Sequence, residues 1–472
     1  MRHSSKNKPI IERLCVTDFA AEGKSIGRVD EKVVFIQKTI PGDIVDVQVT
    51  KKRKNYFEGY PVKFHQYSDI RIEPFCEHFG ICGGCKWQPL PYHKQLFYKQ
   101  QEVYNNLKRI GKIELPEIMP ILPSPREKYY RNKLEFTFSN KRWLTFEEMD
   151  NGKENLNKNG LGFHIPEMFD KVADINKCHL QDEPSNAIRL AIKEYALQNS
   201  LSFFDLREQK GFLRTLIIRT TSISEVMVII VFFHEDEKTR NDLFNYMIKV
   251  FPQVTSWMYV INGKANDSIT DQNAVLFKGR DYIIEEFENL KFNIGAKSFF
   301  QTNSLQALNL YRIVREFAGL TGNETVYDLY TGTGTIAIFL ASQSKKIVGI
   351  EYVAEAIIDA VKNCEINDIH NATFLHGDMK NLLNYELFEK YGYPDVIITD
   401  PPRAGMHTDV IEAIINAAPK RIVYVSCNSA TQARDLCLLD RLYKVSKIQP
   451  VDMFPHTHHV ENVALLEMRG EE

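Results

Sequence analysis

From Asn293 onward the chain alternates between short apolar runs and helical stretches, and this alternation restricts the fold more than any other feature of the sequence. The apolar runs occupy residues 325–330, 346–351, 372–377, 395–400 and 421–426. Runs that are apolar without interruption are typical of parallel strands covered by helices on both faces. We therefore predict a Rossmann-like, doubly wound α/β domain over residues 291–472, in which ligands bind at the carboxyl ends of the strands.

The first part of the chain has a different pattern. From Ile10 to Phe64, short runs of alternating apolar and polar residues are separated by turns such as the one at residues 41–43, which predicts a small, OB-like β-barrel over residues 1–67. The basic run Lys51–Lys54 is followed by two aromatic residues, a pairing that suits RNA backbone and stacked bases. A solvated hairpin tip would have the same composition, and this alternative stays open.

Charge is distributed unevenly, although the net charge is only −2. Residues 1–145 hold 26 Lys and Arg against 16 Asp and Glu, and the rest of the chain holds 33 against 45. A basic first part is typical of a module that binds phosphate groups. Unevenly distributed surface charge without a partner is the alternative.

Residues 129–290 mix apolar strands with helical stretches near 184–199 and 237–250 and a Lys/Asn/Gly-rich loop at 150–160. Strands and helices that do not alternate regularly are typical of the α+β class. We predict an α+β central domain over residues 68–290.

Features of membrane or exported proteins are not found in the sequence. The longest apolar runs, such as Val226–Phe233, are far shorter than the roughly 18 residues of a membrane helix, and the first residues lack the apolar region of a signal peptide. Only three of the eight cysteines lie close together, which does not indicate a disulfide framework. We expect a cytoplasmic monomer with no membrane partner.

A glycine turn follows the first predicted strand of the α/β domain. Gly332 and Gly334 would let the backbone approach a ligand closely, and Glu351, at the end of the next strand, could accept hydrogen bonds from ribose hydroxyls. A nicotinamide fingerprint would require a third glycine where Ala337 stands, and Asp328 would repel a pyrophosphate. S-adenosylmethionine carries a sulfonium and an amino group, so Asp328 favours this cofactor over a dinucleotide. A purely structural turn is the alternative.

Two more predicted strands end in residues with reactive or charged side chains, at the same edge of the sheet. Asp400 precedes two prolines that fix its exit from the strand, and Cys427 follows the strand at 421–426. A thiolate at Cys427 could add to an electron-poor carbon, whereas a buried cysteine often only fills space. Near the end of the chain, Glu461 follows three histidines, which without a neighbouring cysteine are weak evidence for a zinc site.

The clustered cysteines are candidates for a metal site. Cys76, Cys82 and Cys85 have the spacing C-x5-C-x2-C, and Cys178 could complete a set of four. Four thiolates can bind zinc or an iron-sulfur cluster, and the spacing does not decide between the two. It differs from the C-x3-C-x2-C spacing of radical enzymes that use S-adenosylmethionine.

Taken together, these motifs resemble the RNA (uracil-5-)-methyltransferase family over nearly the whole chain. The resemblance depends on the barrel, which is similar to a TRAM domain, on the four cysteines, and on six short motifs in the expected order. The motifs are Tyr130–Lys133, Ser298–Asn303, Asp328–Tyr330, Asp400–Arg403, Ser426–Asn428 and His459–Val463.

The resemblance implies specific roles for these residues. Cys427 would be the nucleophile that adds to C6 of a uridine, and Glu461 would be the base that removes the C5 proton. The S-adenosylmethionine site would be lined by Gln301, Tyr330, Glu351 and Asp400. A [4Fe-4S] cluster would be bound by Cys76, Cys82, Cys85 and Cys178, as in the branch of the family that modifies ribosomal RNA. Because many bacterial family members that act on transfer RNA lack the cysteines and the barrel, the resemblance favours 23S ribosomal RNA as substrate.

Other functions are compatible with parts of the sequence. The same reaction could take place on transfer RNA, or the methyl group could go to cytosine C5 or a base amine, although amine methyltransferases usually place an aromatic residue where Arg403 stands. A non-catalytic RNA-binding assembly factor would not need Cys427 and Glu461. An iron-sulfur redox enzyme would need a flavin or nicotinamide fingerprint, which the sequence lacks.

Overall fold

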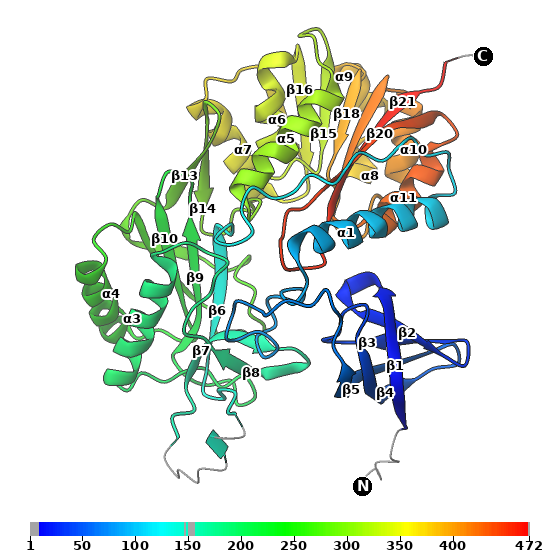
Figure 1. Cartoon of the computed structure of the whole chain (residues 1–472). Helices are drawn as coiled ribbons and strands as arrows, with labels where there is room; N and C mark the ends of the chain where they lie inside the picture. Colours follow the sequence, from blue (N-terminus) through cyan, green and yellow to red (C-terminus); the bar gives the residue numbers. More distant parts are fainter. Residues whose placement is uncertain (1–8, 146–147, 150–155, 471–472) are drawn as a thin grey trace.

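The computed structural model describes residues 9–145, 148–149 and 156–470, which form a barrel, two large mixed sheets and a two-stranded hairpin (Figure 1). Most of the predicted loop at 150–160 lies outside these residues. None of the helices in the described ranges has the length and apolar character needed to cross a membrane.

The predicted N-terminal barrel is confirmed. It is closed, with the strand order β1-β2-β3-β5-β4. Its strands are β1 (Ile10–Phe19), β2 (Ser25–Val29), β3 (Lys32–Ile36), β4 (Ile44–Lys52) and β5 (Tyr56–Gln66). Every second residue of β4 from Val45 to Val49 is buried, and these side chains fill the barrel with those of Leu14, Val34 and Ile36. A barrel of this size has no interior space for a ligand, so its outer surface is what it can offer to a partner.

The central part is a seven-stranded sheet with the order β12-β11-β10-β9-β6-β7-β8. The strands are β6 (Lys133–Ser139), β7 (Gly160–Ile165), β8 (Met168–Asp174), β9 (Leu213–Thr220), β10 (Val226–Phe232), β11 (Ser256–Ile261) and β12 (Ala274–Gly279), and the helices are α3 (Ser185–Gln198) and α4 (Glu237–Val250). The side chains of β10 alternate between the two faces. Val228 and Ile230 pack with residues of α3 and α4, whereas Met227 and Ile229 belong to the core of the C-terminal part of the chain.

The C-terminal sheet has the order β17-β16-β15-β18-β19-β21-β20, in which β15 to β19 are parallel and β21 is antiparallel to both of its neighbours. The strands are β15 (Thr325–Leu329), β16 (Lys346–Glu351), β17 (Ala372–His376), β18 (Val396–Thr399), β19 (Arg421–Ser426), β20 (Tyr443–Val451) and β21 (Glu461–Met468). The predicted doubly wound fold is confirmed. The order reverses between β15 and β18, the point at which such sheets bind ligands.

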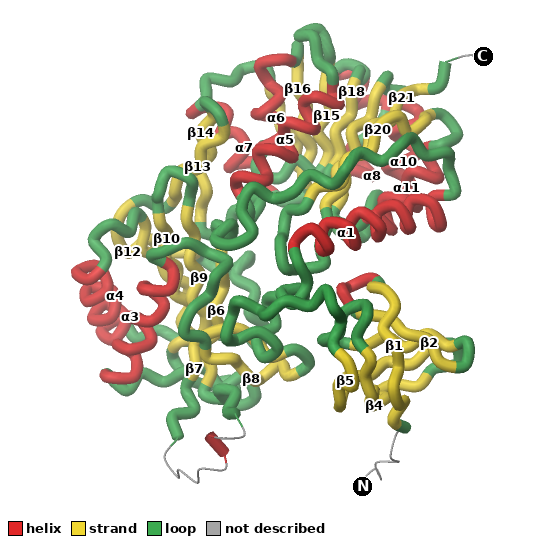
Figure 2. Tube along the Cα trace, in the orientation of Figure 1, coloured by secondary structure: helices red, strands yellow, loops and turns green. Residues whose placement is uncertain are grey.

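Helices cover both faces of this sheet (Figure 2). One face packs against α5 (Ser304–Ala318), α6 (Thr335–Leu340) and α7 (Ala354–Ile366). The other packs against α8 (Met379–Leu382), α9 (Tyr385–Tyr391), α10 (Thr408–Ala417) and α11 (Ser429–Leu439). The hairpin of β13 (Tyr282–Phe287) and β14 (Leu290–Gly295) adds Ile283 and Phe292 to the core on the α5 side. This core continues into the central sheet, so the two parts share one apolar interior.

Helix α1 (Tyr92–Asn106) and the turn of π-helix that extends it to Gly111 pack against α11. Val103 and Leu107 lie in the same apolar core as Tyr424 and Leu436. A segment that precedes the central sheet in the sequence is therefore part of the C-terminal core. The predicted domain limits after residues 67 and 290 remain predictions.

Candidate active site

The carboxyl ends of three neighbouring parallel strands bring the predicted site residues to one edge. Leu329 of β15 is in register with Thr399 of β18, so Tyr330 and Asp400 leave adjacent strands at the same level. Thr399 is in turn in register with Tyr424 of β19. Cys427 follows the end of β19, and therefore lies at this edge as well.

The antiparallel strand β21 brings Glu461 to the same edge. Ser426, the last residue of β19, pairs with Asn462, the second residue of β21. Because the two strands are antiparallel, the residue after Ser426, Cys427, lies opposite the residue before Asn462, Glu461. A thiol and a carboxyl group separated by more than thirty residues in the sequence thus become neighbours because β21 is inserted beside β19.

A cavity opens at the point where the strand order reverses. Five of the predicted cofactor residues line it, namely Gln301, Asp328, Tyr330, Gly332 and Asp400. The other residues that line it were not predicted from the sequence, namely Phe299, Phe300, Tyr311, Thr331, Thr333, Thr335 and Ile336. Several of these residues stand in or beside the sequence motifs described above. Their closeness to those motifs could have identified them as cofactor-binding candidates.

Glu351 and Gly334 are not among the residues that line the cavity, but both contact or adjoin its glycine turn. The Glu351 carboxylate accepts a hydrogen bond from the backbone N–H of Gly332 at 3.0 Å and two more from Tyr352 and Val353 at 2.8 and 2.9 Å. These bonds fix the glycine turn against the end of β16. A carboxylate has about four acceptor positions, so capacity for one further donor remains.

The turn at residues 330–334 has a backbone conformation that most side chains disfavour. Tyr330, Gly332 and Gly334 have φ values of 63°, 56° and 76°. A Cβ atom at Gly334 would lie 2.9 Å from Ala360 Cβ and 3.0 Å from Phe374 Cζ, whereas a Cβ at Gly332 would meet no atom within 4 Å. Gly334 is required for packing, and Gly332 keeps space open on the cavity side. Tyr330 is a non-glycine residue held in a strained region, as is common at ligand sites.

We expect Gly334→Ala to lower the free energy of unfolding by about 2 kcal/mol or more, because left-handed strain of about 1–2 kcal/mol is added to steric overlap. Gly332→Ala is the matched control and should cost only the strain, while weakening cofactor affinity. Chemical denaturation and calorimetry would measure both. Equal losses of stability in the two variants would contradict the packing argument.

Two carboxyl groups in the cavity, the buried Asp328 and the half-buried Asp400, could bind a cation. Burial raises the pKa of Asp328 to about 7, and the hydroxyl of Thr331, 2.5 Å from Oδ2, opposes this rise. Burial and the neighbouring Asp328 raise the pKa of Asp400 to about 7. A positively charged ligand would stabilise both ionised carboxylates. The sulfonium and ammonium groups of S-adenosylmethionine therefore fit this pair.

The negative charge of Glu461 acts on the Cys427 thiol, and Asp400 and Arg403 act on both groups. Burial, followed by the negative charges of Glu461 and Asp400, raises the pKa of the Cys427 thiol to about 11. Burial and Asp400 raise the pKa of Glu461 to about 8, so this buried carboxyl can carry a proton near neutral pH. The positive charge of Arg403 lowers both values. Carboxyl groups with a pKa raised to this range are typical of general acids and bases.

The four predicted metal ligands, Cys76, Cys82, Cys85 and Cys178, line a second cavity, between the segment before α1 and the central sheet. Burial raises the pKa of Cys82 to about 12 and that of Cys85 to about 11, and the other thiols of the set add to both rises. All four thiols are free. Across the described parts of the chain, no group of three His, Cys, Asp or Glu side chains is arranged to hold a single metal ion.

Comparisons with known proteins agree with the motifs. Residues 220–469 match the family described as tRNA (Uracil-5-)-methyltransferase, and residues 11–62 match the TRAM domain. An uncharacterized RNA methyltransferase of Bacteroides thetaiotaomicron is 58% identical over 453 residues, which cover 95% of this chain and 100% of the relative. The chain belongs to the tRNA (uracil-5-)-methyltransferase family. A Porphyromonas gingivalis relative with the same description is also 58% identical, over 96% of this chain and 98% of its own.

One solved structure of a tRNA (uracil-5-)-methyltransferase is similar over almost the whole chain. It is the Pyrococcus abyssi tRNA (uracil-54, C5)-methyltransferase in complex with S-adenosyl-L-homocysteine, with a TM-score of 0.73 and 28% identity, covering 96% of this chain and 100% of that one. The predictions of an S-adenosylmethionine-dependent RNA (uracil-5-)-methyltransferase, of its Rossmann-like fold and of the TRAM barrel are confirmed. The roles of single residues, the RNA class and the iron-sulfur cluster stay predictions.

Proposed function

We propose that the protein methylates C5 of a specific uridine in 23S ribosomal RNA through a covalent adduct between Cys427 and C6 of the base. The register of β19 and β21, which brings Cys427 and Glu461 to the same edge of the sheet as Asp400, is the observation that supports this proposal most directly. In this proposal Gln301, Asp328, Tyr330 and Asp400 contact the cofactor, and Glu351, Gly332 and Gly334 shape the turn beneath it.

The reaction follows from the weak nucleophilicity of uracil C5. S-adenosylmethionine supplies an electrophilic methyl group when bound. The Cys427 thiol gives its proton to water, and the thiolate adds to C6, which places negative charge on C5 and O4. C5 would then take the methyl group as the methyl–sulfur bond of the sulfonium breaks, which would leave a neutral thioether. Ionised Glu461 then takes the C5 proton, the C6–S bond breaks, and the C5–C6 double bond forms again. The target base has to leave any helix to reach Cys427.

Two features bear on the RNA class. The four-cysteine set and the N-terminal TRAM barrel favour ribosomal RNA, because the family branch that the sequence resembles combines them. Transfer RNA is the second candidate, because the similar Pyrococcus abyssi enzyme acts on a transfer RNA. Mapping 5-methyluridine in ribosomal and transfer RNA of cells with and without the gene decides between them. Loss of a modified position in 23S RNA supports the first proposal, and loss only in transfer RNA overturns it.

We further propose that Cys76, Cys82, Cys85 and Cys178 bind a [4Fe-4S] cluster. The four thiols line one cavity, and the family branch that the sequence resembles favours a cluster over a single zinc. None of the residues that line this cavity also lines the cofactor cavity, so we assign the cluster a structural role.

We expect anaerobically purified protein to be brown, with iron and acid-labile sulfide at about four of each per chain. Cys85→Ser should lose most of both, because it removes one of four ligands. Cys437→Ser is the control, because Cys437 lies exposed on α11. Zinc at one per chain without sulfide would contradict the proposal.

A further inference from the structure

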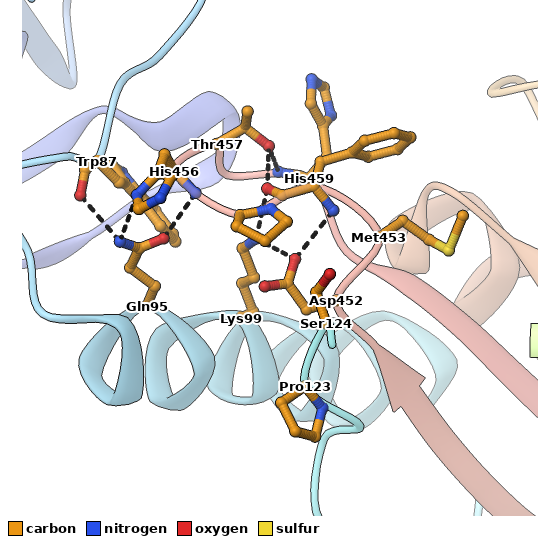
Figure 3. Close-up of polar contacts among 12 residues, drawn as sticks. Trp87, Gln95, Lys99, Pro123, Ser124, Asp452, Met453, His456, Thr457 and His459 are labelled. Atoms are coloured by element: carbon orange, nitrogen blue, oxygen red, sulfur yellow. Dashed lines mark hydrogen bonds and ion pairs between the residues drawn. The ribbon is translucent and has the colours of Figure 1, made fainter. Parts of the chain in front are cut away.

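The residues that lead into Glu461 form a loop, 452–460, which is anchored by side chains from distant parts of the chain. Figure 3 shows two residues of α1, Gln95 and Lys99, which point from the helix into the loop. Both side chains are fully buried. They stand four residues apart, on the helix face that also carries the buried Val103.

Lys99 holds the beginning of the loop. Its Nζ lies 2.6 Å from Oδ1 of Asp452, and both side chains are fully buried. The same Nζ donates to the backbone carbonyl of Phe454 at 3.0 Å, and the Phe454 N–H donates to Asp452 Oδ1 at 3.0 Å. Burial lowers the pKa of Lys99, and the carboxylate of Asp452 opposes this effect. One ammonium group thus ties a side chain and a backbone carbonyl of the loop to α1.

Gln95 holds the middle of the loop. Its Oε1 accepts from the backbone N–H of His456 at 2.8 Å, and its Nε2 lies 3.2 Å from His456 Nδ1. The carbonyl of His456 accepts from the backbone N–H groups of Lys86 and Trp87 at 2.9 and 3.0 Å. His456 itself has a φ of 63°, a strained conformation that these bonds maintain.

The far end of α1 contacts the element that follows the nucleophile. Asn106 Nδ2 donates to the hydroxyl of Ser429, the first residue of α11, at 2.9 Å. The π-helical turn after α1 packs along α11. A single helix therefore contacts both the loop that ends at Glu461 and the helix that begins two residues after Cys427.

We infer that Lys99 and Gln95 are positioning residues that act through the loop 452–460 to hold Glu461 opposite Cys427. The inference depends on the proposed role of Glu461 as the base. Neither residue contacts the reacting atoms. Shifts of about 1 Å in a catalytic group can slow a step about a hundredfold, so loosening the loop should slow proton removal more than cofactor binding.

Variants of the Lys99–Asp452 ion pair can distinguish its effect on protein stability from its effect on the position of the loop. Lys99→Met leaves the Asp452 carboxylate buried without its partner, so its melting temperature should fall. The double variant Lys99→Met, Asp452→Asn removes both charges and should regain most of the lost melting temperature. It still lacks the ammonium group that joins the loop to α1. Lys238→Met, at an exposed Lys–Asp pair of α4, is the matched control.

In the double variant we expect at least about a tenfold rise in the steady-state fraction of covalent, methylated protein–RNA adduct, unchanged affinity for S-adenosylmethionine, and faster amide exchange in peptides spanning 452–461. Lys238→Met should match the wild type in all three measurements. Unchanged exchange in the loop would overturn the inference, whatever the role of Glu461.

A second outcome would also overturn the inference. In it, the double variant shows faster amide exchange in the loop but accumulates no adduct, although Glu461→Gln does accumulate adduct. If Glu461→Gln itself gives no adduct, the proposed base is wrong, and the exchange measurement alone then decides whether α1 holds the loop.

Discussion

Cys427→Ala is expected to abolish RNA methylation, with a loss on the order of 10⁴-fold or more, as is typical when a nucleophile is removed. Without the thiolate nothing adds to C6, and C5 stays too electron-poor to attack a methyl group. Cofactor binding should stay near the wild-type value, because Cys427 is not among the residues that line the cofactor cavity. Methyl transfer from labelled S-adenosylmethionine and calorimetry would measure the two effects.

The control for this variant is Cys437→Ala, ten residues further along and exposed on α11. It should methylate RNA at the wild-type rate. Retained methylation in Cys427→Ala would show that the reaction does not pass through this thiol. Loss of cofactor binding in the same variant would point to a structural effect instead.

Glu461→Gln is expected to stall the reaction after methyl transfer. The amide has nearly the shape of the carboxyl group, so Cys427 and the cofactor cavity should stay intact, but the amide cannot accept the C5 proton. Turnover should fall by about 10²- to 10⁴-fold, the usual contribution of a general base. The variant should accumulate a protein–RNA adduct that carries the transferred methyl group, visible as a slow band on a denaturing gel.

Glu467→Gln is the matched control, because Glu467 lies on the same strand and near its opposite end. It should turn over normally and give no adduct. Near wild-type turnover in Glu461→Gln, with no slow band, would mean that another group or a water molecule takes the proton.

The parts of the fold that were predicted correctly are those with a local signal. The buried strands of the C-terminal sheet are continuous apolar runs, and the alternation in β4 marks the barrel, so each could be recognised within a few residues. The glycine turn and Cys427 were found because they stand directly at the ends of such strands.

The features that could not be predicted depend on contacts between distant segments. Nothing local shows that β21 lies between β19 and β20, although this insertion brings Glu461 to Cys427. A glutamine and a lysine on a helix usually face solvent, and only the packing of α1 on the C-terminal core shows that Gln95 and Lys99 are buried. Their partners, Asp452 and His456, lie more than 350 residues away.

In the proposed reaction, Cys427 forms a bond to C6 before the C5 proton leaves. RNA that carries 5-fluorouridine tests it most directly, because fluorine stands where Glu461 would take a proton, and the wild-type enzyme should stop at the methylated adduct. Mass spectrometry of the digested complex would identify the linked peptide. We expect a single nucleotide bonded to Cys427 with an added methyl group. Absence of an adduct, or a nucleotide bonded to another residue, would contradict it.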